Sequence, residues 1–355
     1  MKTVKLLIKP LDVLFFRDGR PFTTRGESGL PNPQNLTGMI RTYLMSKTGV
    51  NYEKYRNQLS NSTSIIDAMA KLEDHQKWLS QVTVRGPWLY KDTPLVPIPA
   101  NFLKNKDNNE YDLIAPKNNL PGWEYKDGML PLLGKDGRWE TVPGFLNFEG
   151  IKTYLEGKTP TEANIIKSEE LFVEEERTGL AINPDSNTNQ ESMLYAVKFL
   201  RLKSDVCFCA EIDLPQEQKI EDIFPEELCL PWGGENRRVQ IDTIGSWHWP
   251  SHKSTNDQYL TLLISPAIFM ERNGFCWRPN DLSASQLKSA AVSEPLAVSG
   301  WDLARKCPKP TRYAVTAGSV YFWEGKSPST ALNLSDFQDD QVAGWGVSLV
   351  GNWPK

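Results

Sequence analysis

One order of segments recurs in the two halves of this sequence. Each half offers a strand, a helix or long loop, a pair of strands, and a glycine-containing loop that leads into a last strand. In the first half, the opening strand spans 4–10 and the clearest later strand spans 206–213. This order is typical of the β-α-β-β-α-β unit. The sequence therefore predicts an α+β protein with two ferredoxin-like (RRM-like) domains in tandem, with loop insertions.

The length of 355 residues agrees with two domains. A polar stretch at 247–257 separates the halves, so we predict an N-terminal domain of residues 1–248 and a C-terminal domain of residues 249–355. Residues 101–150 are dense in Asn, Lys, Asp, Gly and Pro. That composition predicts an insertion in the first domain, for which a projecting hairpin is one form.

Gln34–Lys47 is the segment of the first half that most clearly predicts a helix. Its apolar residues recur at helical spacing. Asn32 or Asn35 can cap the start of this helix, and Gly49 can end it. Further along, 171–183 and 192–202 predict two extended segments joined by a loop.

The cysteines and the apolar runs of the sequence indicate the cellular compartment in which the protein is expected. The five cysteines are odd in number and include no CxxC pair, which fits a reducing cytoplasm better than a disulfide framework or a zinc ribbon. The N-terminal run alternates lysines with apolar residues, unlike a signal peptide. The longest apolar run, near 259–270, is too short to span a bilayer. We expect a cytoplasmic protein without membrane contact.

Charge is distributed unevenly along the chain. The net charge of −4 argues against a general nucleic-acid-binding surface. Residues 1–48, however, hold eight Lys/Arg and three Asp/Glu, whereas residues 156–228 hold seven Lys/Arg and seventeen Asp/Glu. This pattern suits a protein that binds a polyanion locally and meets a basic partner elsewhere. A solvated acidic face is the simpler interpretation of the second region.

The segment after the opening strand carries Arg17 and Arg20 on a turn. Asp18–Gly19 has turn chemistry, because glycine accepts positive φ. Pro21 makes a helical conformation of Arg20 unfavourable. The segment therefore presents two guanidinium groups on a stiff loop, either to bind an anion or only to be solvated there.

Two glycine loops are the other candidate binding elements. Gly233–Gly234 precedes Arg237 and Arg238, and Gly344–Gly346 precedes Gly351. Closely spaced glycines leave backbone N–H groups open to phosphate. The alternative is a tight turn or bulge. Neither loop is a GxGxxG or Walker A motif, so a nucleotide-cofactor interpretation is weak.

Catalytic patterns are sparse. There are three histidines, and His248 and His252 have a spacing that allows a metal pair, but neither Cys nor an acidic partner is near them in sequence. The GxSxG and HExxH motifs are absent, and so is the RNP1 signature of a conventional RRM. We therefore expect no catalytic residue, no metal and no cofactor.

Six motifs occur in order along the chain: Pro10–Phe22, Thr37–Arg41, Glu176–Gly179, Leu230–Arg238, Ala317–Trp323 and Gly344–Gly351. Taken together, they resemble those of one family, the third subunit of the Cmr complex of type III-B CRISPR effectors, within the RAMP superfamily. Together they span most of the chain. The last loop has four residues between Gly346 and Gly351, and the 101–150 insertion has no matching motif.

The resemblance implies two ferredoxin-like domains, no catalytic activity, and a role in holding the 5′ tag of the crRNA. It also implies two neighbours, namely the large polymerase/cyclase-like subunit and a backbone RAMP subunit. The RNA-binding residues that it implies, together with the basic opening loop, are Arg17, Arg20, Arg25, Gly38, Arg41, Arg177, Gly233, Gly234, Arg237, Arg238, Gly344, Gly346 and Gly351.

The function predicted is thus a non-catalytic RNA-binding and assembly subunit in antiviral defence. The alternative is a crRNA-processing endoribonuclease of the same superfamily, in which His248 or His252 would act as the general acid or base. An enzyme acting on small nucleotides is disfavoured because phosphate-loop signatures are missing.

Overall fold

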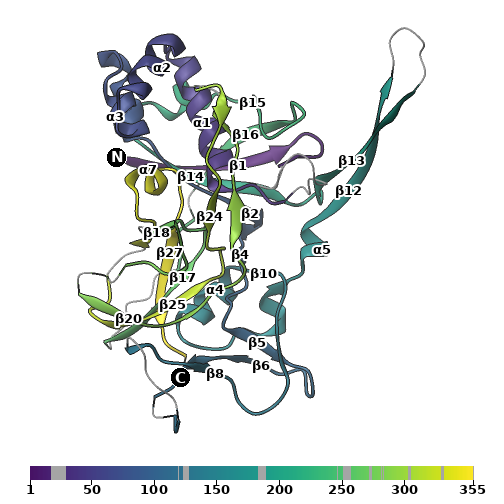
Figure 1. Cartoon of the computed structure of the whole chain (residues 1–355), viewed down its shortest axis with the longest axis vertical. Coiled ribbons are helices and arrows are strands. Elements are labelled where there is room, and N and C mark those ends of the chain that lie inside the picture. Colours follow the sequence, from purple (N-terminus) through teal and green to yellow (C-terminus); the bar gives the residue numbers. More distant parts are fainter. Residues whose placement is uncertain are drawn as a thin grey trace.

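The computed structural model of the chain is organised around two antiparallel sheets, with a long hairpin projecting away from them (Figure 1). The structure describes residues 1–16, 29–118, 120–122, 128–182, 189–245, 247–250, 257–271, 274–280, 282, 284–302, 305–328 and 332–354. The opening-loop residues Arg17, Arg20 and Arg25 lie outside the described residues.

The first sheet has six strands in the order β15-β16-β1-β14-β2-β3. Adjacent strands are all antiparallel, and β1 pairs with both β14 and β16. Val4, Leu6 and Ile8 alternate inward along β1 and are buried, as period-two patterning requires. The strands are β1 (Lys2–Pro10), β2 (Thr83–Lys91), β3 (Thr93–Pro94), β14 (Cys207–Leu214), β15 (Leu228–Pro231) and β16 (Arg238–Ile244).

A layer of helices covers one face of this sheet. The predicted helix is α1 (Pro33–Lys47), and the Asn32 side chain accepts a hydrogen bond from Asn35 N while Asn35 Oδ1 accepts one from Asn32 N. The two asparagines thus form a reciprocal cap. The helix ends at Lys47, and Gly49 follows its C-cap Thr48 with φ of +69°. The layer also holds α2 (Tyr52–Ser60), α3 (Ile65–Ala70), a 3₁₀ helix at Asp74–Gln81 and the short α6 (Ile220–Ile223).

The second sheet has five strands in the order β20-β25-β17-β27-β26. Its neighbouring strands are also antiparallel, and α7 (Gln338–Val342) leads into the last central strand. The strands are β17 (Gln258–Leu263), β20 (Ser285–Ala291), β25 (Val320–Gly325), β26 (Leu332–Asn333) and β27 (Val347–Asn352).

The two sheets share a buried core. One hydrophobic cluster joins Trp88 and Cys209 of the first sheet to Leu260, Val320 and other apolar residues of the second. The Trp88 indole Nε1–H donates to the Ile264 carbonyl over 2.8 Å. The first sheet ends at Ile244 and the second begins at Gln258, so the predicted boundary at 248/249 falls between them. That boundary stays a prediction.

The segment predicted as an insertion forms short strands packed against the second sheet. Leu130 N donates to the Lys288 carbonyl over 2.6 Å, and the Ser289 hydroxyl donates to the Leu130 carbonyl, so the segment docks on the edge strand β20. A projecting hairpin is therefore the wrong form for it. This region and its surroundings hold β4 (Val96–Pro97), β5 (Phe102–Asn105), β6 (Tyr111–Leu113), β7 (Ala115–Pro116), β8 (Leu132–Leu133), β9 (Trp139–Thr141), β10 (Phe145–Leu146), α4 (Phe148–Leu155), a 3₁₀ helix at Glu162–Asn164 and β11 (Ile165–Ile166).

The projecting hairpin is formed by β12 (Phe172–Ile182) and β13 (Asn189–Leu202), which follow the short α5 (Ser168–Leu171). Its strands pair only with each other in the described sheets, and a bulge lies between Leu180 and Ile182. The base is tied to the segment that follows β1, because Leu14 and Leu200 exchange two backbone hydrogen bonds of 2.8 Å. The two extended segments predicted here are thus present.

Small hairpins complete the C-terminal half. They are β18 (Phe269–Glu271) with β19 (Gly274–Cys276), β21 (Leu296–Val298) with β24 (Arg312–Ala314), and β22 (Trp301–Asp302) with β23 (Cys307–Pro308). Within the described ranges, no helix has the length and apolarity needed to cross a membrane.

Candidate nucleic-acid interface

The predicted binding residues that the structure describes fall in three places. Arg177, Gly233, Gly234 and Arg237 meet at the base of the β12–β13 hairpin, with Arg238 next to them. Gly38 and Arg41 lie on α1, beside the loop that holds Gly344 and Gly346. Gly351 lies within β27, away from both groups.

Asp12 is the centre of the group at the hairpin base. Its Oδ2 lies 3.1 Å from Arg237 Nη1 and 3.8 Å from Arg177 Nη2, and its Oδ1 lies 3.2 Å from Arg201 Nη2. A single carboxylate just after the opening strand therefore gathers arginines from both strands of the hairpin and from the segment that follows Gly233–Gly234.

Glu175 holds two of the same arginines from the other side. Its Oε1 lies 2.6 Å from Arg177 Nη2, and its Oε2 accepts from Arg201 Nε. The hydrogen bonds from Arg201 and Arg177 lower the pKa of Glu175 to about 2. The carboxylate is thus charged throughout the neutral range and keeps both guanidinium groups in place.

Phe199 forms an aromatic base beneath this cluster. The guanidinium carbons of Arg237 and Arg177 lie 4.7 and 5.1 Å from the centre of its ring, a cation–π arrangement. The Phe15 ring packs against Phe199 with centroids 5.6 Å apart. The chain therefore lies beside this cluster at the last residues described before the opening loop.

The cluster carries an excess of positive charge. Three arginines face two carboxylates, and the Nε of Arg237 is covered but has no hydrogen-bond partner among the described residues. Planar guanidinium groups held in fixed orientation match the geometry of phosphate oxygens. The arrangement can receive a phosphate, although Asp12 competes with it for the same N–H groups.

The pKa of Glu175 leads to a testable pH dependence. Because the folded-state pKa lies below the ordinary value of 4.5, the stabilising contribution is complete above about pH 4.5 and is lost as pH falls toward 2. We expect a side-chain ¹³C NMR titration of Glu175 to show a midpoint near 2. Arg201→Ala should return the midpoint toward 4.5, and an unchanged midpoint in that variant would contradict the assigned ion pair.

Gly233 and Gly234 lie against the chain's own backbone. Gly233 has φ of +84°, and a Cβ added there would lie 2.5 Å from the Phe15 carbonyl oxygen. Gly234 N donates to that same oxygen over 2.8 Å. Close packing thus accounts for both glycines, as in the tight-turn alternative. Contact with RNA phosphate at this loop stays a prediction.

The other three glycines of the predicted loops are also explained by close approach. A Cβ added at Gly344 would lie 2.5 Å from the Val84 carbonyl oxygen, and one at Gly346 would lie 2.5 Å from Ser335 N. A Cβ at Gly351 would lie 2.8 Å from the Cα of Leu155 in α4. These close contacts account for the three glycines, whereas their predicted RNA contacts stay untested.

Gly38 is different, because an added Cβ would meet nothing within 4 Å. It lies in the second turn of α1, whose Thr37 hydroxyl donates to the Ala343 carbonyl over 2.9 Å. Arg41, one turn further on, shares with it the lining of a pocket between α1 and the C-terminal half. The α1 residues are therefore not part of the cluster at the hairpin base.

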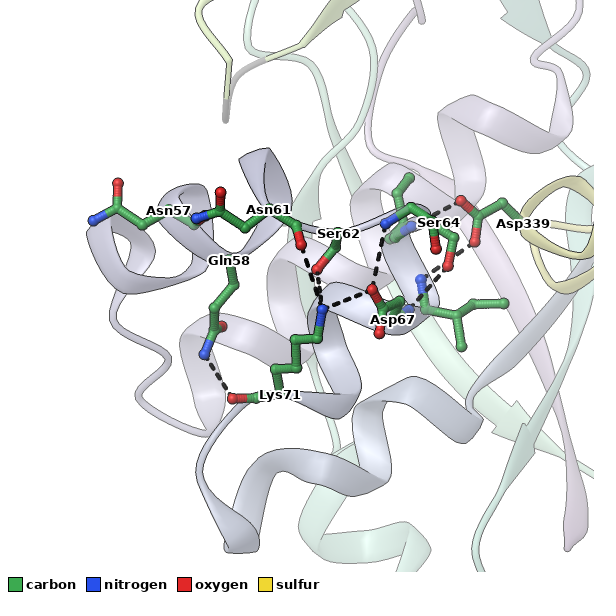
Figure 2. A network of polar contacts seen from close by, with 11 residues as sticks. Asn57, Gln58, Asn61, Ser62, Ser64, Asp67, Lys71 and Asp339 are labelled. Carbon is green, nitrogen blue, oxygen red and sulfur yellow. Dashed lines mark hydrogen bonds and ion pairs between the residues drawn. The ribbon is translucent and has the colours of Figure 1, made fainter.

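The polar network in Figure 2 joins α3 to α7, and its Asp339 also lines this pocket. The Asp339 carboxylate of α7 accepts from Ile65 N and Ile66 N, at 2.8 and 3.2 Å, and so binds the start of α3. On the far side of α3, Lys71 Nζ lies 2.8 Å from Asp67 and 3.0 Å from the Ser62 hydroxyl. The helical layer is thus fixed to the C-terminal half.

Sequence reasoning missed Asp12, Glu175, Phe199 and Arg201 as members of the cluster. Glu175 lies directly opposite Phe199 in the hairpin register, and Val173 lies opposite Arg201. Residues two apart on paired strands share a face. Glu175 and Arg177 on one strand, and Phe199 and Arg201 on the other, are each two residues apart. This spacing could have predicted that the four side chains share one face of the hairpin. Asp12 gave none, since its partners are more than 160 positions away.

The described residues bring together no group of three or more His, Cys, Asp or Glu that could hold a metal ion. His248 lies among the described residues, and its predicted partner His252 lies outside them.

Residues 6–353 match the family described as CRISPR-associated protein (Cas_Cmr3). The chain belongs to the Cas_Cmr3 family. The predicted resemblance to the third Cmr subunit is thereby confirmed, and the chain is a Cmr subunit of a type III-B CRISPR effector. No curated protein matches the sequence.

Solved structures agree with this family at the level of the fold. One is described as the cryo-EM structure of the type III-B Cmr-beta bound to cognate target RNA, with a TM-score of 0.53. Another is the same assembly with target RNA and AMPPnP in state 1, with a TM-score of 0.52. In each case the identity is 17%, and the match covers 90% of this Cas_Cmr3 chain and 86% of the solved chain.

Proposed function

We propose that this Cas_Cmr3 protein is a non-catalytic subunit that holds the 5′ tag of the crRNA and docks the large polymerase/cyclase-like subunit. The observation that carries the RNA-binding part is the convergence of three arginines, Arg177, Arg201 and Arg237, on Asp12. Two of them, Arg177 and Arg237, lie over Phe199, where the described part of the opening segment ends. Phosphate contacts from arginines supply much of the affinity of proteins for RNA. The similar Cmr-beta structures, which are bound to target RNA, support an RNA-associated role.

We also infer that each large sheet is a ferredoxin-like domain. In the first sheet, β1 lies between β14 and β16, and β2 pairs with the outer side of β14. In the second, β17 lies between β25 and β27, and β20 pairs with the outer side of β25. The same central order supports a tandem repeat of one fold, with the hairpins after β17 in place of its first helix.

The RNA-binding role predicts a lower crRNA affinity when the cluster is changed. In filter binding with a crRNA at fixed salt, Arg177→Ala with Arg237→Ala should weaken retention by roughly tenfold or more. The slope of log K against log salt should become shallower by about 1 for each phosphate that the variant no longer neutralises. Arg138→Ala, which removes an exposed arginine of the insertion, is the matched control and should leave retention unchanged.

Asp12→Asn separates binding from a purely structural role. It releases the arginines from a competing carboxylate, so crRNA affinity should rise even if stability falls. Equal crRNA retention by the Arg177/Arg237 double variant, Asp12→Asn and the parent chain would refute the site. Arg17→Ala with Arg20→Ala tests the opening loop in the same assay.

The endoribonuclease alternative makes an opposite prediction. Purified chain incubated with repeat RNA should give no specific cleavage if the proposed function holds. Specific cleavage that disappears in His248→Ala would replace the proposed function with the enzymatic one.

A further inference from the structure

A pocket of about 600 Å³ lies between the helical layer and the C-terminal half, separate from the hairpin-base cluster. Residues of α1, α2 and α3 form one side, and the β21–β24 and β22–β23 hairpins with α7 form the other. Its size is that of small-molecule sites, which occur preferentially at such junctions. The two halves of the chain therefore enclose a space that neither forms alone.

Cations without partners line this pocket. Within the described part of the chain, Arg41, Arg56 and Lys309 have no carboxylate at ion-pair distance. The Nε atoms of Arg41 and Arg56 are covered and have no hydrogen-bond acceptor there. Burial lowers the pKa of both Arg41 and Lys309; for Lys309 the pull of Asp302 opposes this, and the neighbouring Arg312 and Arg41 add to it. Charges in such surroundings are costly without a counter-anion.

The nearby Asp302 and Asp339 attract Lys309 and Arg41 from a distance, but each carboxylate makes its hydrogen bonds to other groups. Asp339 accepts the backbone N–H groups at the start of α3. Asp340 binds Arg312 through two hydrogen bonds, and Asp302 pairs with Arg305. The pocket thus keeps a positive excess at Arg41 and Lys309.

Aromatic surface faces the same space. Trp301 lines the pocket and is 57% exposed. Tyr55 is buried, and its phenol keeps its proton because burial raises its pKa. Exposed aromatic rings stack on nucleobases in a sequence-tolerant way. Met45, Met69 and Val298 add apolar side chains to the lining.

Gly38 lines the pocket on the α1 side and has no side chain that would occupy it. Glycine inside a helix lowers helix stability relative to alanine. Nothing in the described fold requires the missing Cβ here, since the space beside it is empty. Open space next to unpaired cations is what a bound anion would fill.

We propose that this pocket binds a phosphorylated nucleoside, with its phosphate at Arg41 and Lys309 and its base against Trp301. Two sources share this chemistry, a free nucleotide and the terminal nucleotide of an RNA. Binding of an RNA terminus here depends on the proposed crRNA-binding function, whereas binding of a free nucleotide does not depend on it.

The test is calorimetric titration of the full chain with AMP, adenosine, inorganic phosphate, and a short oligoribonucleotide with or without a 5′ phosphate. One AMP should bind per chain, more tightly than adenosine or phosphate alone. Binding only of the 5′-phosphorylated oligonucleotide also supports the proposal and identifies the RNA end as the source. Cys307, exposed at the pocket, should be protected from iodoacetamide by the bound ligand, whereas Cys229 should not.

Two variants locate the site. Arg41→Gln should weaken AMP binding by about 10- to 100-fold, as expected when a charged hydrogen bond is removed. Gly38→Ala should also weaken binding while the melting temperature stays equal or rises, which shows that the fold is intact. Arg138→Gln is the control and should bind AMP like the parent.

The proposal is overturned if neither AMP nor the oligonucleotides bind or protect Cys307. It is overturned as well if phosphate binds as tightly as AMP, or if only a glutamate-rich peptide protects Cys307. Failure of the proposed crRNA-tag role would instead appear as unchanged retention in the Arg177/Arg237 variant, with AMP binding intact.

Discussion

Replacing Arg312 with alanine is expected to lower the free energy of unfolding by about 3–5 kcal/mol. Arg312 of β24 holds Asp340 of α7 through two hydrogen bonds of 2.8 and 2.9 Å. The Asp340 side chain is only 7% exposed. Removing the arginine therefore leaves a buried carboxylate without its counter-charge. Urea denaturation of the parent and variant chains measures the difference.

Two further variants test whether the loss of stability comes from the buried Arg312–Asp340 pair. Arg305→Ala removes an exposed arginine paired with Asp302 and should cost no more than about 1 kcal/mol. The double variant Arg312→Ala/Asp340→Ala should recover part of the stability, because neither charge then remains buried and unpaired. Equal effects of Arg312→Ala and Arg305→Ala would show that the buried pair is not important for stability.

The second large effect is expected for Gly344→Ala. Gly344 has φ of +85°, which costs an alanine about 1–2 kcal/mol. Its added Cβ would also lie 2.5 Å from the Val84 carbonyl oxygen, so strands of the first sheet must shift away from the loop before β27. Overpacking adds about 1–3 kcal/mol. The total decrease in free energy of unfolding should be about 2–5 kcal/mol.

Gly49→Ala is the matched control for that change. Gly49 has φ of +69°, but nothing lies within 4 Å of an added Cβ. Its destabilisation should therefore be limited to the backbone contribution of about 1–2 kcal/mol. If thermal or urea unfolding gives the same decrease for both glycines, the close approach to Val84 does not matter. Gly344 would then be explained by its backbone conformation alone.

Local chemistry predicted several elements well. The spacing of apolar residues along α1, the asparagines before it and Gly49 after it indicate its start and end, because caps and periodicity act within a few residues. The strands at 4–10 and 206–213 alternate clearly and pair with each other in the first sheet. For the insertion, scattered turn residues gave no signal of the strand edge to which it binds.

The candidate site was predicted only in part, because it is assembled from distant segments. Arg177 and Arg237 were expected from a family resemblance, but the residues that orient them come from three separate parts of the chain. The glycines show the same limit. Their spacing is equally compatible with a phosphate-binding nest and with close backbone packing, and only the positions of Phe15, Val84 and Ser335 reveal the packing.

The sequence by itself determined the strands near 4–10 and 206–213, the capped helix after the opening segment, and the family, since these depend on residues near one another or on motifs in linear order. The tertiary structure alone decided which charges meet. Among the described residues, Asp12 lies beside three arginines, because folding brings together residues more than 160 positions apart. In the same described part, Arg41 Nε is covered without a hydrogen-bond partner. Electrostatic interactions depend on distance in space, which the linear order of this chain does not contain.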